Sequence, residues 1–215
     1  MRSSRPAPWE SPRAGSRCGT STLHNGRGLH LPKIYAAEGG RLYWEAPAGL
    51  DAGVLLRDTD LPTLIHRANV TGPELALDID TVTGLGTDAA AVDFVVARLG
   101  IAVVLTRRPQ LAALVAELGG LGLLQVLAFD STGLNRALDG HPRRPGVGTA
   151  ISPGLVLAHL HPAELAALPR PILAYGFVDT PEAARAILTT ADSVVLRPEA
   201  ASLMGAPVSL EPAGV

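Results

Sequence analysis

The side chains in this sequence that could do chemistry are carboxylates and arginines that follow short apolar runs. A carboxylate can act as a general acid or base, or bind Mg²⁺. An arginine offers a planar fork that suits phosphate. The polar residues after these runs include Arg57, Asp58, Asp60, Asp78, Asp80, Thr106, Arg107, Arg108, Asp130, Ser131 and Arg197. Their types favour an anionic ligand or acid–base chemistry.

Asp78 and Asp80 are two residues apart near the end of an apolar run. Because side chains alternate along a strand, we expect both carboxylates on the same side of one strand. The pair could hold Mg²⁺ or serve as acid and base. Asp80 could instead cap a turn or pair with an arginine such as Arg107. No third ligand is evident, so the sequence predicts no metal site.

Arg107 and Gly176 are the strongest candidates for contact with an anion. Arg107 follows the fourth apolar run, and its alternative role is a structural ion pair with Asp80 or Asp130. Gly176 follows the seventh run. Its backbone N–H can approach a phosphate because it has no Cβ, although a tight turn would need the same glycine. Together with the start of the last helix after Arg197, these positions favour a small phosphorylated ligand.

Residues that enzymes commonly use as bases or nucleophiles are missing from these positions. No histidine directly follows an apolar run, and no Ser-His-Asp or Cys-His grouping is apparent. A barrel aldolase that forms a Schiff base needs a lysine inside the barrel. The only lysine, Lys33, is at the start of the first run. The sequence therefore favours a binding protein over an enzyme, and we expect no cofactor.

Eight short apolar runs recur about 20 to 26 residues apart, as a repeat of strand and helix requires. They are 33–37, 53–56, 74–79, 101–105, 123–128, 148–151, 171–174 and 193–196. Helices are predicted over 87–99, 109–118 and 180–188, with poorer ones over 41–50 and 154–168. Strict alternation implies a parallel sheet. Eight units close into a (β/α)8 TIM-type barrel over 31–206, and an open doubly wound sheet is the alternative.

The two ends of the chain lack this pattern. Residues 1–30 are rich in Arg, Ser, Gly and Pro, and we expect a disordered arm there. Its arginines could contact RNA phosphates, but an unselected extension is the simpler interpretation. Residues 207–215 are expected to form a disordered tail.

Composition excludes several classes of protein. No apolar run approaches the ~20 residues that span a bilayer, and the N-terminus has no hydrophobic segment of a secretory signal. The single cysteine, Cys18, cannot form an internal disulfide, which fits a reducing compartment. The formal net charge of -2 is not that of a strongly basic nucleic-acid binder. We therefore expect a cytoplasmic protein with no membrane partner.

From about Gly53 to Met204, the residues after the strands resemble the motifs of the glycerol-3-phosphate responsive antiterminator family, in order. The family's third strand ends in His-x-Asp-Leu-x-x-Gly-Leu-x-x-Asp, and residues 78–88 read Asp-Ile-Asp-Thr-Val-Thr-Gly-Leu-Gly-Thr-Asp. Later family segments read Ser-Thr-Arg, Asp-Ser, Leu-Pro-Gly and Ala-Gly-Gly. They correspond here to 105–107, 130–131, 152–154 and 174–176.

The resemblance implies a barrel that binds glycerol 3-phosphate or a similar metabolite. Such a protein would act on leader mRNA so that transcription of glycerol metabolism genes passes a terminator. Taken with the strand ends, the resemblance points to these ligand-binding residues: Asp80, Thr106, Arg107, Asp130, Gly154, Gly176 and Arg197.

The sequence departs from the family at several positions. The motif histidine is Asp78, an arginine is Val126, a glutamate is Ala150, and a Thr-Ser pair after the eighth strand is Leu196-Arg197. Asp78 adds negative charge that would oppose a nearby phosphate. Arg197 could bind an anion by another geometry.

Three functions are compatible with the sequence. The first is a metabolite-responsive, RNA-binding regulator. The second is a phosphate-binding barrel isomerase or lyase that uses Asp80 or Asp130 as a base. The third is a diverged barrel that has lost its ligand and acts as an interaction protein. The first is favoured by the resemblance and by the missing catalytic groups, since a barrel alone does not decide function.

Overall fold

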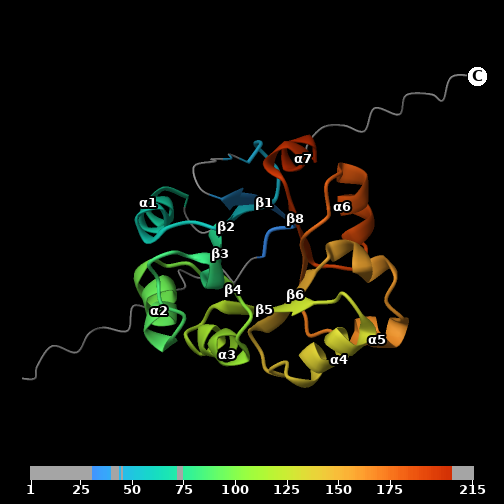
Figure 1. The fold of residues 1–215 in the computed structure, drawn as a ribbon. Coiled ribbons are helices and arrows are strands. Elements are labelled where there is room, and N and C mark those ends of the chain that lie inside the picture. Colours follow the sequence, from blue (N-terminus) through green and yellow to red (C-terminus); the bar gives the residue numbers. More distant parts are fainter. Residues whose placement is uncertain (1–30, 40–43, 45, 72–74, 205–215) are drawn as a thin grey trace, which may run out of the picture.

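Eight parallel strands close into a barrel in the computed structural model, which describes residues 31–39, 44, 46–71 and 75–204 (Figure 1). Each strand pairs with the next in the chain, and β8 returns to pair with β1. The strands are β1 (Ile34–Gly39), β2 (Ala52–Arg57), β3 (Leu75–Asp78), β4 (Val103–Thr106), β5 (Leu121–Leu127), β6 (Val147–Ser152), β7 (Ile172–Ala174) and β8 (Ser193–Leu196). The closed order confirms the predicted barrel and excludes the open sheet. The predicted arm 1–30 and tail 207–215 lie outside the described residues.

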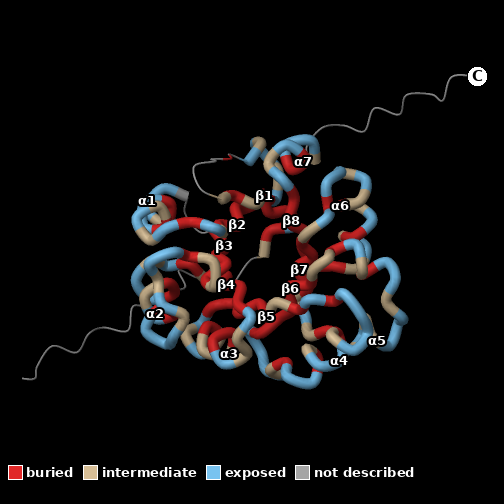
Figure 2. Tube along the Cα trace, viewed as in Figure 1, coloured by how far each residue is buried: buried red, intermediate tan, exposed pale blue. Residues whose placement is uncertain are grey.

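Helices and single turns surround the strands, with their exposed sides outward (Figure 2). The helices are α1 (Leu61–Thr71), α2 (Ala89–Asp93), α3 (Pro109–Glu117), α4 (Ser131–Asp139), α5 (Pro162–Ala167), α6 (Pro181–Ile187) and α7 (Pro198–Leu203). Two short 3₁₀ helices are η2 (Ile79–Thr81) and η4 (Gly154–Ala158), and η3 (Phe94–Arg98) is a π-helical segment that continues α2. In the described ranges, no helix combines the length and apolar character that a membrane crossing requires.

The strands are buried on both faces because apolar residues pack both inside the barrel and between the strands and the helices. The inner core fills the barrel with Tyr35, Leu55, Ala76, Val103, Leu105, Leu121, Leu123, Ala150, Leu173, Tyr175 and Val195. The outer core lies between strands and helices and includes Leu56. Side chains alternate along a strand. The side chain of Leu55 therefore points into the barrel and that of Leu56 points outward. The side chain of Arg57, at the carboxyl end of β2, points into the barrel again.

The prediction that Asp78 and Asp80 share one side of a strand is wrong. β3 ends at Asp78, and the chain turns at once into η2. Thr81 stabilises this turn because its Oγ1 donates to the carbonyl oxygen of Asp78 at 3.1 Å and accepts from the N–H of Asp58 at 2.9 Å. The Asp78 carboxylate therefore faces β2, while Asp80 reaches the end of β4.

Two predicted helices also differ from the structure. The described part of 41–50 contains no helix; here Trp44 reaches α7, donating from Nε1 to Oγ of Ser202 at 2.9 Å. The helix predicted over 154–168 is divided into η4 and α5. Pro162 begins α5 rather than interrupting it, because the first helical position needs no backbone donor.

Candidate ligand-binding site

A cavity of about 260 Å³ lies at one mouth of the barrel, by the carboxyl ends of four strands. It is lined by Ala37, Arg57, Tyr175, Gly176, Phe177, Val178, Asp179, Val195, Leu196 and Arg197. These residues belong to β1 and β2, or to β7 and β8 with the loops that follow them. The cavity therefore lies on one side of the mouth, at the end where barrels of this type bind ligands.

Two arginines bring positive charge to this cavity. Arg57 forms ion pairs with Asp58, at 3.2 Å between Nε and Oδ2, and with Asp78, at 4.0 Å between Nη2 and Oδ2. Arg197 contacts Asp179, with 3.3 Å between Nε and Oδ1. A guanidinium has five N–H donors, so each arginine retains donors for a bound anion.

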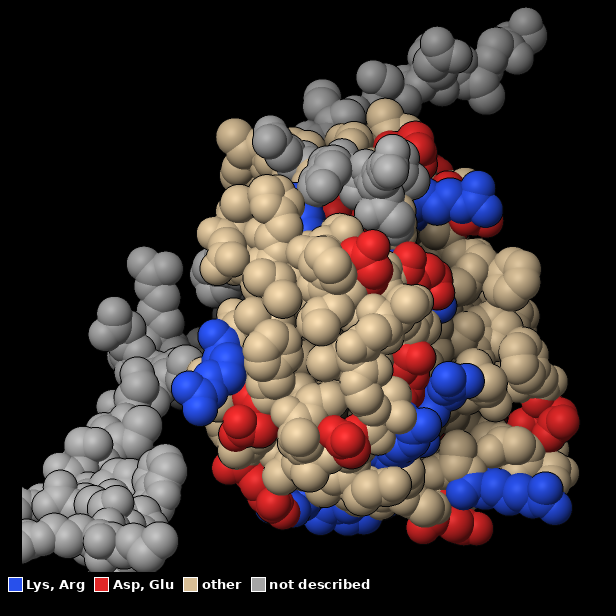
Figure 3. Space-filling view, turned by 60° about the vertical axis from the view of Figure 1, so that its left-hand side comes forward, with Lys and Arg blue, Asp and Glu red and all other residues tan. Residues whose placement is uncertain are grey.

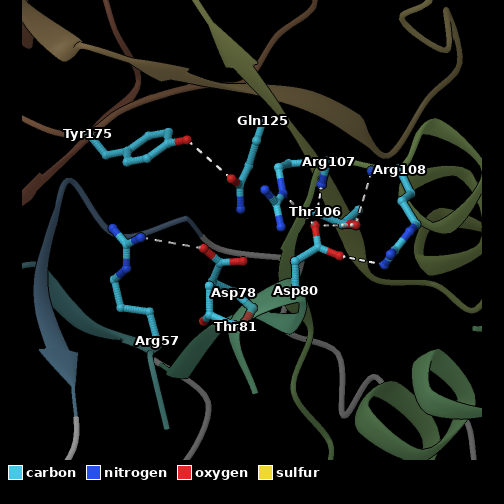
Figure 4. Close-up of polar contacts among 9 residues, drawn as sticks. All are labelled: Arg57, Asp78, Asp80, Thr81, Thr106, Arg107, Arg108, Gln125 and Tyr175. Atoms are coloured by element: carbon cyan, nitrogen blue, oxygen red, sulfur yellow. Dashed lines mark hydrogen bonds and ion pairs between the residues drawn. The ribbon is translucent and has the colours of Figure 1, made fainter. Parts of the chain in front are cut away.

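A row of polar side chains crosses the mouth from β2 to the end of β7 (Figure 4). It runs from Arg57 through Asp78 and Gln125 to Tyr175, whose hydroxyl donates to Oε1 of Gln125 at 3.2 Å. Burial raises the pKa of Asp78, against the opposing effects of Arg57 and Gln125. Burial, assisted by the charge of Asp78, raises the pKa of Tyr175 to about 12. Tyr175 is therefore a neutral hydrogen-bond donor at physiological pH.

Asp80 holds the connection between β4 and α3. Its buried carboxylate accepts hydrogen bonds from Oγ1 of Thr106 at 3.1 Å and from the N–H of Arg107 at 2.6 Å. Arg108 donates from Nη1 to Oδ1 at 2.8 Å, whereas Nε of Arg107 stays 3.7 Å from Oδ2. The Arg107 side chain is exposed and lies beside Gln125 in Figure 4. Arg108 therefore makes the closer ion pair, and Arg107 keeps guanidinium donors for a ligand.

Asp78 and Asp80 consequently do not form a metal site with each other. Asp78 faces Arg57, and Asp80 is engaged by Thr106 and Arg108. Across the residues that the structure describes, no three His, Cys, Asp or Glu side chains lie close enough together to bind a metal ion.

The other predicted site residues organise the loops of the mouth. Asp130 caps α4, because its Oδ1 accepts from the N–H of Gly133 at 2.6 Å. The N–H of Gly154 donates to the carbonyl oxygens of Tyr175, at 2.7 Å, and Gly176, at 3.0 Å. Gly154 therefore ties the loop after β6 to the loop after β7, where the cavity lies.

Gly176 has a backbone conformation that favours glycine. Its φ is +77°, and a Cβ there would lie 2.8 Å from Oγ of Ser152. The next residue, Phe177, also has a positive φ of 60°. Phe177 lines the cavity and is nevertheless 70% exposed. This loop thus presents backbone to the cavity and an aromatic ring to solvent.

Large apolar side chains are exposed along the part of the mouth formed by the loops after β5, β6 and β7. We call Leu127, Phe129, Leu155 and Phe177 the apolar rim; Phe129 is 73% exposed. Backbone hydrogen bonds join these loops, including one from Ala128 to Ser152 at 2.8 Å. Apolar groups gathered on a surface commonly mark a binding site.

The structure brings together only some of the residues predicted from the sequence. Gly176 and Arg197 line the cavity, whereas Asp80, Thr106 and Arg107 form a cluster across the mouth. Three further site residues were not assigned to the ligand: Gln125, Tyr175 and Arg57, the last of which is among the polar residues noted after the apolar runs. Alternation along β2 was a usable signal for Arg57. The Tyr175–Gln125 contact joins residues 50 positions apart, so no local sequence pattern predicts it.

A comparison with known families matches residues 54–196 to the glycerol-3-phosphate responsive antiterminator family. This range extends from β2 to β8. No curated protein matches the chain.

Several solved structures have a similar fold. A glycerol uptake operon antiterminator-related protein from Thermotoga maritima is 23% identical, with a TM-score of 0.62, over 81% of this chain and 99% of that one. The glycerol uptake operon antiterminator regulatory protein from Listeria monocytogenes is 18% identical, with a TM-score of 0.63, over 76% and 91%. A deoxyribose phosphate aldolase from Aeropyrum pernix is 14% identical, with a TM-score of 0.52, over 80% and 88%.

Proposed function

The chain belongs to the glycerol-3-phosphate responsive antiterminator family, and from this we propose that it is a metabolite-responsive transcription antiterminator. It binds glycerol 3-phosphate or a similar small phosphorylated metabolite at the barrel mouth and acts on leader mRNA of glycerol metabolism genes. The family match over 54–196 carries the proposal. Both activities belong to the cytoplasm, where we place the protein.

The cavity supports the metabolite half of the proposal. Its volume of about 260 Å³ is below the roughly 300–1,000 Å³ that hold drug-sized ligands, so it suits a small metabolite. Arg57 and Arg197 supply charged donors, and Gly176 allows close approach of the backbone. Asp80 and Thr106 position Arg107, while Gly154 and Asp130 fix the neighbouring loops.

The apolar rim supports the RNA half. Single-stranded RNA is commonly bound by stacking of its bases on exposed aromatic rings. Phe129 and Phe177 are such rings, and Arg107 provides a cation at the same mouth. By contrast, the face on the α1 and α2 side carries interspersed acidic and basic side chains, without a continuous basic area among the residues drawn in colour (Figure 3).

The geometry gives less support to a Schiff-base enzyme. Lys33 immediately precedes β1, at the opposite end of the strand from the mouth. The similarity to the aldolase extends to the fold alone. An isomerase or lyase that uses Asp80 as its base is disfavoured because that carboxylate is already engaged by three donors.

Calorimetric titration of the full chain with glycerol 3-phosphate, with and without a leader RNA, tests the proposal. We expect saturable binding of the metabolite and a change in its affinity when RNA is present, since coupling between two sites is reciprocal. No binding of either molecule to the folded protein would instead favour a diverged barrel that acts as an interaction protein. Turnover of sugar phosphates would favour the enzyme.

A further inference from the structure

We propose that Asp78 and Gln125 recognise a hydroxyl group of the bound phosphate ester. The site then selects esters that carry a hydroxyl at this end over esters that carry a carboxylate there. This inference rests on the proposed function, which supplies the phosphate ester, and it assigns the selectivity to two residues of the polar row.

Unsatisfied polar atoms mark the place where the hydroxyl would bind. Oδ1 of Asp78 and Nε2 of Gln125 are both buried, and neither has a hydrogen-bond partner. They lie near each other: the Gln125 amide approaches the Asp78 carboxyl closely enough to lower its pKa, but the two atoms do not reach hydrogen-bond geometry. Leaving a buried donor or acceptor unpaired costs free energy. One hydroxyl group removes both costs, since it donates to the carboxylate and accepts from the amide.

Arg57 is the charged side chain that lies beside Asp78 and also reaches the cavity. Its Nη2 lies 4.0 Å from Oδ2 of Asp78, beyond hydrogen-bond distance, and its side chain is 35% exposed and lines the cavity. A phosphate in the cavity offers Arg57 a stronger, bidentate partner. When Arg57 turns to the phosphate, Asp78 loses its nearest cation and gains the ligand hydroxyl in exchange.

The charge of Asp78 explains why a carboxylate would be rejected at this end. Two carboxylates have no hydrogen to share when both are ionised, and they repel each other at short range. Asp80 lies close enough to disfavour further negative charge on Asp78. A ligand carboxylate can therefore accept from Gln125 but is repelled by Asp78, whereas a ligand hydroxyl accepts from Gln125 and donates to Asp78.

Calorimetric titration with two three-carbon phosphates tests the inference. We expect wild-type protein to bind glycerol 3-phosphate at least tenfold more tightly than 3-phosphoglycerate. Asp78→Asn keeps the size and an acceptor but removes the charge. It should weaken glycerol 3-phosphate binding and strengthen 3-phosphoglycerate binding, so that the preference falls to about threefold or less. Gln125→Leu should weaken only the hydroxyl ligand.

Glu117→Gln is the matched control, since it also changes an acid to an amide but at an exposed position in α3 that pairs with Arg144. It should leave both affinities unchanged. If the wild type binds neither phosphate while remaining folded, the proposed function fails together with the inference. If glycerol 3-phosphate binds and Asp78→Asn leaves the preference unchanged, the inference alone is overturned.

Discussion

Asp80 and Arg108 form an ion pair, with 2.8 Å between Oδ1 and Nη1, that joins the turn after β3 to the start of α3. The Asp80 side chain is nearly fully buried, while Arg108 is partly exposed. Oδ2 of the same carboxylate serves Thr106 and the backbone of Arg107. Asp80 is therefore a structural centre of the mouth in addition to its proposed place near the ligand.

We predict that Asp80→Ala destabilises the fold by about 2–3 kcal/mol, because hydrogen bonds to a charged group contribute about 1.5–3 kcal/mol and the remaining donors can partly reach water. Asp80→Asn should lose less, since it retains an acceptor oxygen. Urea unfolding followed by circular dichroism measures both changes. Equal stability of wild type and Asp80→Ala would show that the network contributes nothing.

Arginine substitutions should locate the ligand phosphate. A charge-assisted bond contributes roughly 1.5–3 kcal/mol, so Arg197→Ala and Arg107→Ala should each weaken glycerol 3-phosphate binding about ten- to a hundredfold. Lysine at either position should restore only part of the affinity, because it lacks the fork. Calorimetry provides the measurement.

Arg185→Ala is a suitable comparison, since Arg185 is paired with Glu182 on α6. It should bind as the wild type does. Unchanged affinity for Arg197→Ala alone would remove that residue from the proposed site and leave the phosphate with Arg57 and Arg107.

The difference in stability between the wild type and Asp78→Asn should depend on pH in a defined direction. Burial raises the folded-state pKa of Asp78 above its unfolded value. Ionisation therefore costs folding free energy, and stability from this group is lost as pH rises through the folded-state pKa. At pH 7 the variant should melt at a higher temperature than wild type, with a difference that shrinks as the pH falls toward 4. A lower melting temperature at pH 7 would mean that the Arg57 ion pair outweighs the burial cost.

RNA binding should depend on the exposed rings of the apolar rim. Replacing a ring that stacks on a base costs about 1–3 kcal/mol, so Phe129→Ala should weaken leader RNA binding about five- to a hundredfold. Leu203→Ala, at an exposed apolar position on α7, is the comparison and should have no effect. Fluorescence anisotropy with a labelled leader RNA measures both.

The N-terminal arm offers a competing route to RNA. Loss of RNA binding on removal of residues 1–28, with Phe129→Ala unchanged, would move the contact from the rim to the arm.

The barrel was predictable because its signal is local and repeated. Apolar runs such as 193–196 coincide with a strand, and alternation with helices requires parallel pairing. The arrangement of the mouth was less predictable because it depends on partners far apart in the chain. Asp80 lies in the 3₁₀ turn that Thr81 stabilises, and its closest ion pair is with Arg108 rather than Arg107. No pattern in the sequence distinguishes two adjacent arginines.

In the proposed function, the backbone strain at Phe177 limits how strongly metabolite binding can change the affinity for RNA. It belongs to both the cavity wall and the apolar rim, and its left-handed backbone costs a non-glycine residue of order 1–2 kcal/mol. If metabolite binding relaxes this backbone and RNA binding requires it, the two affinities are coupled by at most about five- to thirtyfold. A coupling of this size gives a graded response rather than an all-or-none one. Transcription would then vary continuously with the intracellular concentration of the phosphorylated metabolite.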